Sequence, residues 1–127
     1  MFDVLHVGHV RYLQAAAREA DILVVGVNSD ASVRAIKGPS RPLVNERERA
    51  ELVSAIRDVA YVTIFDDSSP ARLIAAIKPD VHCKGTDYTA DSVPERDVVL
   101  GYGGRVAIVG DPKDHSTTSI LEKMRKQ

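Results

Sequence analysis

Hydrophobic positions near the start of the chain switch from helical spacing to a continuous run. Val10, Leu13, Ala17 and Ala20 recur at intervals of three or four residues, and the apolar, mostly β-branched run from Ile22 to Val27 follows them. Apolar residues at helical spacing predict a helix that packs through one face, whereas a continuous apolar run predicts a strand buried on both faces. This part of the chain therefore predicts a helix followed by a buried parallel strand.

The same alternation continues along the rest of the chain. Asn45 followed by Glu48 resembles a capping box, Pro70 suits the first turn of a helix, and Pro79 ends that helix. The expected elements are a helix from Asn45 through Ile56, a strand over Tyr61–Phe65, a helix from Ser69 through Ile77, a strand over Val81–Lys84, a helix over Val93–Tyr102, a strand over Val106–Val109 and a helix over Ser119–Lys126. Such alternation predicts an α/β fold, a Rossmann-like parallel sheet with helices on both faces, and 127 residues suit a single domain spanning 1–127.

The alternation also calls for a strand ahead of the first helix. Only Met1 precedes Phe2, so the first strand of the expected fold is missing from these residues. Either the sequence lacks its true N-terminus or a neighbouring chain supplies the strand. We favour the first explanation.

Charge and composition limit which binding partners and which cellular location we expect for the protein. The formal net charge is −1, which provides no long-range field for nucleic acid or for an anionic membrane surface. The run from Ile22 to Val27 is too short to cross a bilayer, and the N-terminus lacks the pattern of a signal peptide, so we expect a cytoplasmic protein. The single cysteine, Cys83, lies in an apolar stretch and is expected to be a buried structural thiol rather than a nucleophile.

Two histidines flank a glycine where the first helix is expected to begin. His6 and His9 are three residues apart and so share one helix face, and Gly8 lets a ligand approach the backbone closely. Unpaired backbone N–H groups and the positive end of the helix dipole favour an anion at such a position. The segment therefore predicts a phosphate site.

In open parallel sheets, ligands bind beyond the carboxyl ends of the strands. Two polar segments follow the first predicted strand and are expected near such an end. Asn28-Ser29-Asp30 offers Asp30 to sugar hydroxyls or to a metal-bound water, although a turn with helix-capping side chains explains the segment equally well. The segment from Lys37 to Pro42 joins Lys37 and Arg41 to turn-forming residues, which suits either a flap over phosphates or a solvated basic loop.

Two later segments carry similar groups. Lys84-Gly85-Thr86-Asp87-Tyr88 follows a buried strand and supplies a cation for phosphate, a carboxylate for ribose and an aromatic ring for a base; an ordinary change from strand to loop is the alternative. Ser116, Thr117 and Thr118 precede the last helix and suit either phosphate oxygens or a plain N-cap. We expect His82 to pack within its strand, His115 to lie near the hydroxyl run, and Arg57 to be the helical arginine best placed to reach a nucleotide.

The order of these motifs resembles that of the cytidylyltransferase-like nucleotidyltransferases. The matching segments are Phe-Asp-x-x-His-x-Gly-His from residue 2, Lys-Gly-x-Ser-Arg-Pro from residue 37, Lys-Gly-x-Asp-Tyr from residue 84 and Ser-Thr-Thr from residue 116. Together with Phe65-Asp66-Asp67-x-x-Pro70 and Gly103-Gly104, they are most similar to the adenylyltransferase domain of ADP-heptose synthase. The resemblance covers essentially the whole chain.

This resemblance implies an enzyme that transfers AMP from ATP to D-glycero-β-D-manno-heptose 1-phosphate. The products are pyrophosphate and ADP-heptose, a precursor of lipopolysaccharide or a related surface glycan. Mg²⁺ would screen the phosphates, and we expect no metal ligands from the protein itself. The resemblance further implies a homodimer and a separate kinase that makes the sugar phosphate.

The resemblance also assigns residues to roles. His6, His9 and Lys37 would be catalytic, and Asp30, Lys37 and Arg41 would bind the acceptor. The expected nucleotide-binding residues are Phe2, Asp3, Gly8, His9, Lys84, Gly85, Asp87, Tyr88, Ser116, Thr117 and Thr118. The chain departs from the family pattern at Asp114, where glycine is usual, and at Ala60, where aspartate is common.

Two alternatives stay open at this point. Glycerol-3-phosphate cytidylyltransferases tend to carry a tryptophan after their Gly-Asp-Asp segment and an arginine shortly before Ser-Thr-Thr, whereas this chain has Tyr88 and Asp111. A non-catalytic nucleotide-binding or dimerisation module is the other alternative. Such a module would bind ATP without releasing pyrophosphate.

Overall fold

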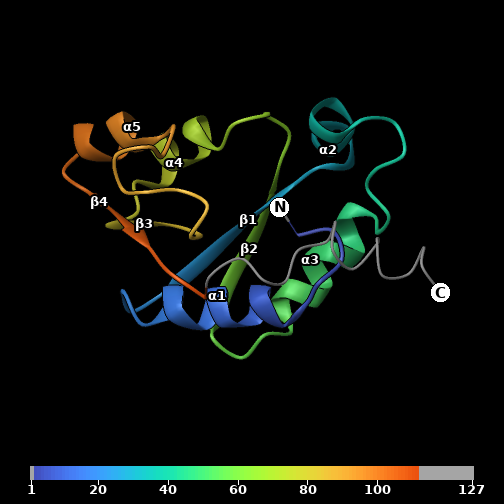
Figure 1. The fold of residues 1–127 in the computed structure, drawn as a ribbon, viewed down its shortest axis with the longest axis horizontal. Coiled ribbons are helices and arrows are strands. Elements are labelled where there is room, and N and C mark those ends of the chain that lie inside the picture. The colour runs from blue at the N-terminus through green and yellow to red at the C-terminus, as the bar shows by residue number, and fades with distance from the viewer. Residues whose placement is uncertain (1, 112–127) are drawn as a thin grey trace.

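The protein alternates helices and parallel strands, as the hydrophobic pattern predicts (Figure 1). The structure is a computed structural model that describes residues 2–111. The elements are α1 (Val7–Ala17), β1 (Leu23–Asn28), α2 (Asp30–Lys37), α3 (Glu46–Ser54), β2 (Val59–Phe65), α4 (Ala71–Ile77), β3 (Val81–Lys84), α5 (Arg96–Gly101) and β4 (Arg105–Ile108). None of the helices within these residues is long and apolar enough to cross a membrane.

The strands form two parallel pairs. β1 lies beside β2, with Val27 opposite Ile64, and β3 lies beside β4, with Cys83 opposite Ala107. The parallel strands and the helices packed beside them confirm the predicted α/β fold. Within residues 2–111 the strands form two pairs, and no described strand pairs with both β1 and β3.

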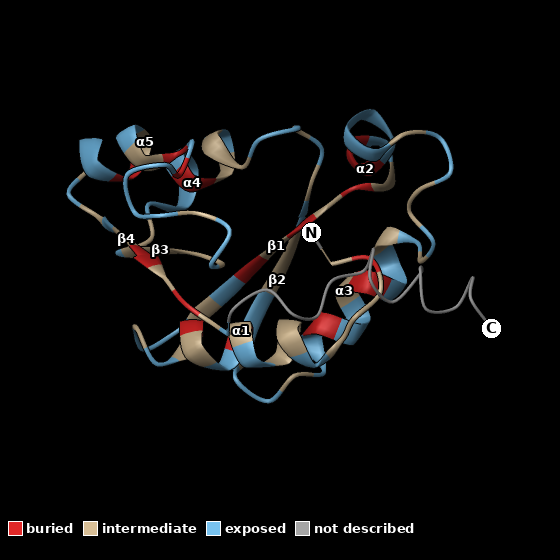
Figure 2. Ribbon diagram, viewed as in Figure 1, coloured by how far each residue is buried: buried red, intermediate tan, exposed pale blue. Residues whose placement is uncertain are grey.

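Helix α1 links the two strand pairs through its buried face. Leu13 packs in a core cluster with Val25, Val27 and Val53, and Ala16 packs in a second cluster with Ala107 and Val109. Figure 2 shows buried residues on α1 and along β1. Tyr12 contacts both clusters, and its hydroxyl donates a hydrogen bond to the Cys83 carbonyl of β3 at 2.8 Å. Because one helix is held by both pairs, its N-terminus has a fixed position relative to each of them.

Local signals explain where most helices begin. Asn45 caps α3 as predicted, because its side-chain oxygen accepts a hydrogen bond from the Glu48 N–H at 2.9 Å. Helix α5 is shorter than expected and begins at Arg96 rather than Val93. The helix expected over 119–126 lies outside the described residues.

Helix α2 is the element that the sequence analysis did not assign. Ser29 caps it by accepting a hydrogen bond from the Ser32 N–H at 3.1 Å, so the helix-capping alternative for Asn28-Ser29-Asp30 is confirmed. Only Ser32 and Val33 of this helix are buried, so its hydrophobic pattern is too short to stand out in the sequence. The helix ends at Gly38, whose φ of 101° suits a residue without a side chain.

Candidate functional site

Two facing imidazoles mark the start of α1. The rings of His6 and His9 are stacked, with their centroids 3.9 Å apart and their planes 24° from parallel. His6 is the N-cap: its Nδ1 accepts a hydrogen bond from the Gly8 N–H at 3.1 Å, and His9 Nδ1 accepts one from the His6 N–H at 3.3 Å. The structure thus brings the two histidines together at a helix start, as their spacing predicts.

The surroundings of His9 keep its ring neutral. Burial and the neighbouring His6 imidazole lower the pKa of His9 to about 4, and the edge of the Phe2 ring packs against it at a centroid distance of 4.9 Å. Because Nδ1 of each histidine accepts a hydrogen bond, Nε2 is the nitrogen of each ring that remains to donate. The pair therefore presents Nε2–H donors to a ligand at the start of the helix.

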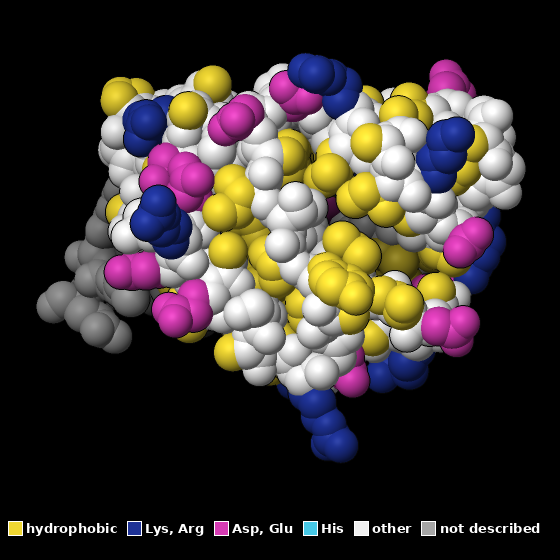
Figure 3. All heavy atoms as spheres, turned by 180° about the vertical axis from the view of Figure 1, so that it is seen from behind, with side chains coloured by type: hydrophobic (Ala, Val, Ile, Leu, Met, Phe, Trp, Pro, Cys, Tyr) yellow, Lys and Arg dark blue, Asp and Glu magenta, His cyan; other side chains and the backbone are white. Residues whose placement is uncertain are grey.

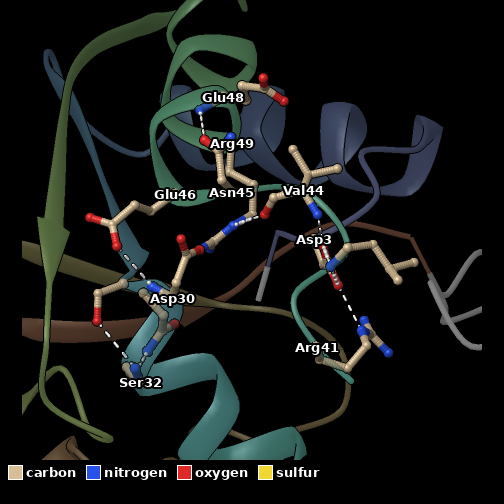
Figure 4. Close-up of polar contacts among 12 residues, drawn as sticks. Asp3, Asp30, Ser32, Arg41, Val44, Asn45, Glu46, Glu48 and Arg49 are labelled. Atoms are coloured by element: carbon tan, nitrogen blue, oxygen red, sulfur yellow. Dashed lines mark hydrogen bonds and ion pairs between the residues drawn. The ribbon is translucent and has the colours of Figure 1, made fainter. Parts of the chain in front are cut away.

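Asp3 anchors the loop that carries Arg41. Its carboxylate accepts hydrogen bonds from Arg41 Nε at 2.7 Å and from the backbone N–H groups of Leu43 and Val44 (Figure 4). Burial raises the pKa of Asp3, but these bonds lower it by more, so that it lies below the usual 3.8. Asp3 is 2% exposed and does not line the cleft described next, so its contacts hold the loop that carries Arg41 and do not place the carboxylate at a nucleotide.

A cleft of about 780 Å³ collects most of the predicted residues. Its volume lies in the range of small-molecule sites. The predicted residues that line it are Phe2, His6, Gly8, His9, Lys37, Arg41, Lys84, Gly85, Asp87 and Tyr88. These residues come from the start of α1 and the segment before it, from the end of α2 and the loop after it, and from the end of β3 and the loop after it, so the cleft joins segments far apart in the sequence.

The cleft also has an apolar part that the sequence analysis did not foresee. Ile22, Val24 and Ile77 line it, with exposed fractions of 63%, 39% and 45%. Hydrophobic side chains gather through the middle of the face seen in Figure 3. Val24 lies on β1, which has a strand partner on one side only within the described residues.

Lys84 lies at the carboxyl end of β3 between an acid and an aromatic ring. Its Nζ is 3.6 Å from Glu95 Oε1 and 5.3 Å from the centroid of the Tyr88 ring. His82, two residues earlier, packs within the strand as expected, and its Nε2 lies 3.8 Å from Glu95 Oε2. Sequence reasoning missed Glu95, because an acid just before a short helix carries no signal of burial.

The structure does not bring Asp30 to the cleft. Its carboxylate accepts a hydrogen bond at 2.9 Å from Arg49, which is 1% exposed, and Asp30 does not line the cleft (Figure 4). Asp30 therefore serves the packing of α2 against α3. Arg57 is exposed and also lies outside the cleft lining.

Of the remaining predictions, the one for Cys83 falls within the described residues and those near the C-terminus do not. Cys83 is half-buried in β3, and burial raises the pKa of its thiol to about 11, which fits the expected structural thiol. The expectations for His115, Ser116, Thr117, Thr118 and Asp114 fall outside residues 2–111.

Comparisons with known proteins agree with the motif order. The bifunctional protein HldE of Geobacter metallireducens is 53% identical over 123 residues, which are 97% of this chain and 25% of that protein. HldE of Syntrophotalea carbinolica is 50% identical over 123 residues, again 97% of this chain and 25% of the relative. The chain thus spans about a quarter of the length of these relatives.

A solved structure extends the similarity to the fold. The lipopolysaccharide core biosynthesis protein of Thermoplasma volcanium superposes with a TM-score of 0.69 at 28% identity, over 86% of this chain and 88% of that one. The family model described as cytidylyltransferase-like matches residues 1–123. The chain therefore belongs to the cytidylyltransferase-like family.

Proposed function

We propose that the chain is the nucleotidyltransferase domain, over residues 1–127, of a sugar-phosphate adenylyltransferase. It transfers AMP from ATP to D-glycero-β-D-manno-heptose 1-phosphate and forms ADP-heptose and pyrophosphate. The observation that carries the proposal is the stacked pair of His6 and His9 at the start of α1, in one cleft with Lys37, Arg41 and Lys84.

The histidine pair suits the phosphates of the nucleotide. The Nε2–H group of the neutral His9 ring donates a hydrogen bond, and the start of α1 adds the positive end of the helix dipole. Donors fixed before the reaction stabilise charge that develops in the transition state without further reorganisation. His6 and His9 are accordingly proposed as catalytic residues, with Gly8 and Phe2 beside them at the nucleotide.

Two cations from the segment at the end of α2 complete the phosphate site. Lys37 ends α2 and Arg41 follows it, and both side chains line the cleft. The Asp3 carboxylate fixes the Arg41 guanidinium through Nε. We propose that Lys37 and Arg41 bind the acceptor phosphate and the triphosphate, which keeps the two anions close in spite of their repulsion.

The reaction asks for positioning more than for covalent chemistry. A phosphate oxygen of the sugar 1-phosphate attacks the α-phosphorus of ATP in line and forms a new P–O bond. The bond from the α-phosphorus to the bridging oxygen breaks, and pyrophosphate leaves with the electron pair. The histidine pair and Lys37 stabilise the charge that collects on the leaving group.

Recognition of the nucleotide is assigned to the end of β3 and the segment after it. Tyr88 offers an aromatic face, Lys84 a cation and Asp87 a carboxylate, and all three line the cleft together with Gly85. Ser116, Thr117 and Thr118 are proposed to bind the outer phosphates. Support for these roles comes from the motif match.

Mg²⁺ is proposed to arrive with the nucleotide. Within residues 2–111, no group of three or more His, Cys, Asp or Glu side chains is placed to hold a metal ion. Mg²⁺ is commonly bound through substrate phosphates with few protein ligands, so we propose that the substrate is MgATP. A homodimer and a cytoplasmic location complete the proposal.

A pyrophosphate-release assay tests the function. The protein that contains this chain is incubated with ATP or CTP, each in combination with heptose 1-phosphate or glycerol 3-phosphate. ATP with the heptose should be turned over fastest, by about tenfold or more over the other pairs, since a site that hydrogen-bonds one ligand rejects those that leave its groups unpaired. CTP with glycerol 3-phosphate as the fastest pair would identify the cytidylyltransferase alternative. Binding of ATP with no pyrophosphate from any pair would identify a non-catalytic module.

A further inference from the structure

The buried carboxylate of Glu95 lies next to the ammonium of Lys84. Glu95 is 3% exposed, with Oε1 3.6 Å from Lys84 Nζ and Oε2 3.8 Å from His82 Nε2. Oε2 of Glu95 and Nε2 of His82 are buried without a hydrogen-bond partner. All three side chains line the cleft that holds the histidine pair.

Burial of the Glu95 carboxylate costs free energy, and a gain in stability does not explain it. A buried carboxylate loses its hydration, and attraction to a partner repays that loss only when geometry and hydrogen bonding are both good. Here one carboxylate oxygen lacks a hydrogen bond, and the contact to Lys84 is longer than a hydrogen bond. Glu95 is therefore poorly explained as a stabilising ion pair.

The strand places both neighbours of Glu95 on one face. His82 and Lys84 are two residues apart on β3, and side chains at that spacing point to the same side of a strand. Burial lowers the pKa of His82, and the attraction of Glu95 offsets only part of that shift, so the ring is neutral at pH 7. The Lys84 ammonium is thus the cation that faces the Glu95 charge.

The other side of the ammonium faces an aromatic ring. Lys84 Nζ lies 5.3 Å from the centroid of Tyr88, within the range of a cation–π contact. A lysine side chain is long and loses much conformational freedom when it is fixed. Glu95 on one side and Tyr88 on the other restrict the ammonium to the cleft wall beyond β3.

We propose that Glu95 is a positioning residue for Lys84, holding its ammonium beside Tyr88 so that it meets the phosphates of the bound nucleotide. Glu95 acts through Lys84 and touches no reacting atom. This inference rests on the proposed function only in that the cleft binds ATP.

A double-mutant cycle on ATP affinity tests it. The dissociation constant of ATP is measured by calorimetry for the wild type, Glu95→Gln, Lys84→Met and the double variant. Glu95→Gln should weaken ATP binding by about three- to tenfold, and the same change in the Lys84→Met background should have no further effect, since interacting residues are not additive. Equal losses in both backgrounds, or an unchanged affinity in Glu95→Gln, would overturn the positioning role.

Control variants separate this role from general damage. Asp91→Asn makes the same acid-to-amide change at an exposed residue of the same loop, 3.7 Å from Arg96, and should leave ATP affinity unchanged. If Glu95→Gln does not fold, Glu95→Asp keeps the charge and serves in the same cycle, with the same requirement that its effect vanish without Lys84.

The outcomes also distinguish this inference from the proposed function. Coupling between Glu95 and Lys84 in a protein that releases no pyrophosphate with heptose 1-phosphate would keep the positioning role and reject the acceptor. Turnover of heptose 1-phosphate, together with additive effects of the Glu95 and Lys84 variants on ATP affinity, would keep the proposed acceptor and reject the positioning role. A wild type that does not bind ATP would reject both.

Discussion

At the scale of single residues, the histidine pair has a chemistry that spacing alone does not reveal. The interval between His6 and His9 predicts a shared face, and the structure agrees. Whether the His9 ring is neutral or charged depends on its burial and on the neighbouring His6, and both depend on tertiary packing. The spacing therefore predicted where the pair lies but not the protonation state of His9.

The lowered pKa of His9 predicts a distinct titration. Its pKa is about 4 in the folded protein against 6.5 for an ordinary histidine, so the unfolded chain binds the proton more readily. The free energy of unfolding should therefore fall as the pH drops from 6.5 toward 4, and this contribution is fully present above pH 6.5. In an NMR titration, the His9 ring signal should stay constant from neutral pH down to about 5.5. A midpoint near 6.5 would contradict the neutral assignment.

Asp3 predicts a loss of stability when its charge is removed. Asp3→Asn leaves the Arg41 side chain and two backbone donors with a weaker acceptor, so the free energy of unfolding measured by urea titration should fall by about 2–4 kcal/mol. The pKa of Asp3 is lowered on folding, so its contribution is present above pH 3.8 and is lost as the pH falls through the folded value. Asp58→Asn, at an exposed position, is the control. Equal stability of Asp3→Asn and the control would show that Asp3 does not anchor the loop.

At the scale of elements, helix caps and strand positions follow from local sequence, whereas strand neighbours do not. Asn45 with Glu48 marked the start of α3, and the range of β3 matched its prediction. The grouping of strands into two pairs depends on contacts between distant segments, which periodicity cannot reveal. Helix α2 escaped notice because only two of its residues are buried.

The cap of α3 predicts a small, local effect on stability. Asn45→Ala removes the acceptor for the Glu48 N–H and should lower the free energy of unfolding by about 1 kcal/mol. Asn45→Asp keeps an acceptor at the same place and should remain within about 0.5 kcal/mol of the wild type. Chemical denaturation of the three proteins in parallel gives both values. A loss in the aspartate variant equal to that in the alanine variant would contradict the assignment of the cap.

At the scale of the whole molecule, the cleft is where the sequence predictions converge. Motifs that were each ambiguous alone, such as the segments from Lys37 and from Lys84, line the same cleft as the histidines. Their convergence could be anticipated because parallel strands deliver their carboxyl ends to one edge. Glu95 behind Lys84, and the pairing of Asp30 with Arg49, could not be anticipated, since each depends on a side chain buried by a distant element.

The central claim is that the stacked histidines stabilise the departing pyrophosphate. The most direct measurement is kcat for pyrophosphate release from MgATP and heptose 1-phosphate in the wild type, His9→Ala and Gln14→Ala. Gln14 is exposed on α1 outside the cleft lining, so its variant controls for damage to the helix and should stay within about twofold of the wild type. His9→Ala should lose about 10²- to 10³-fold in kcat with its unfolding transition intact. A folded His9→Ala variant with near wild-type kcat would contradict the account.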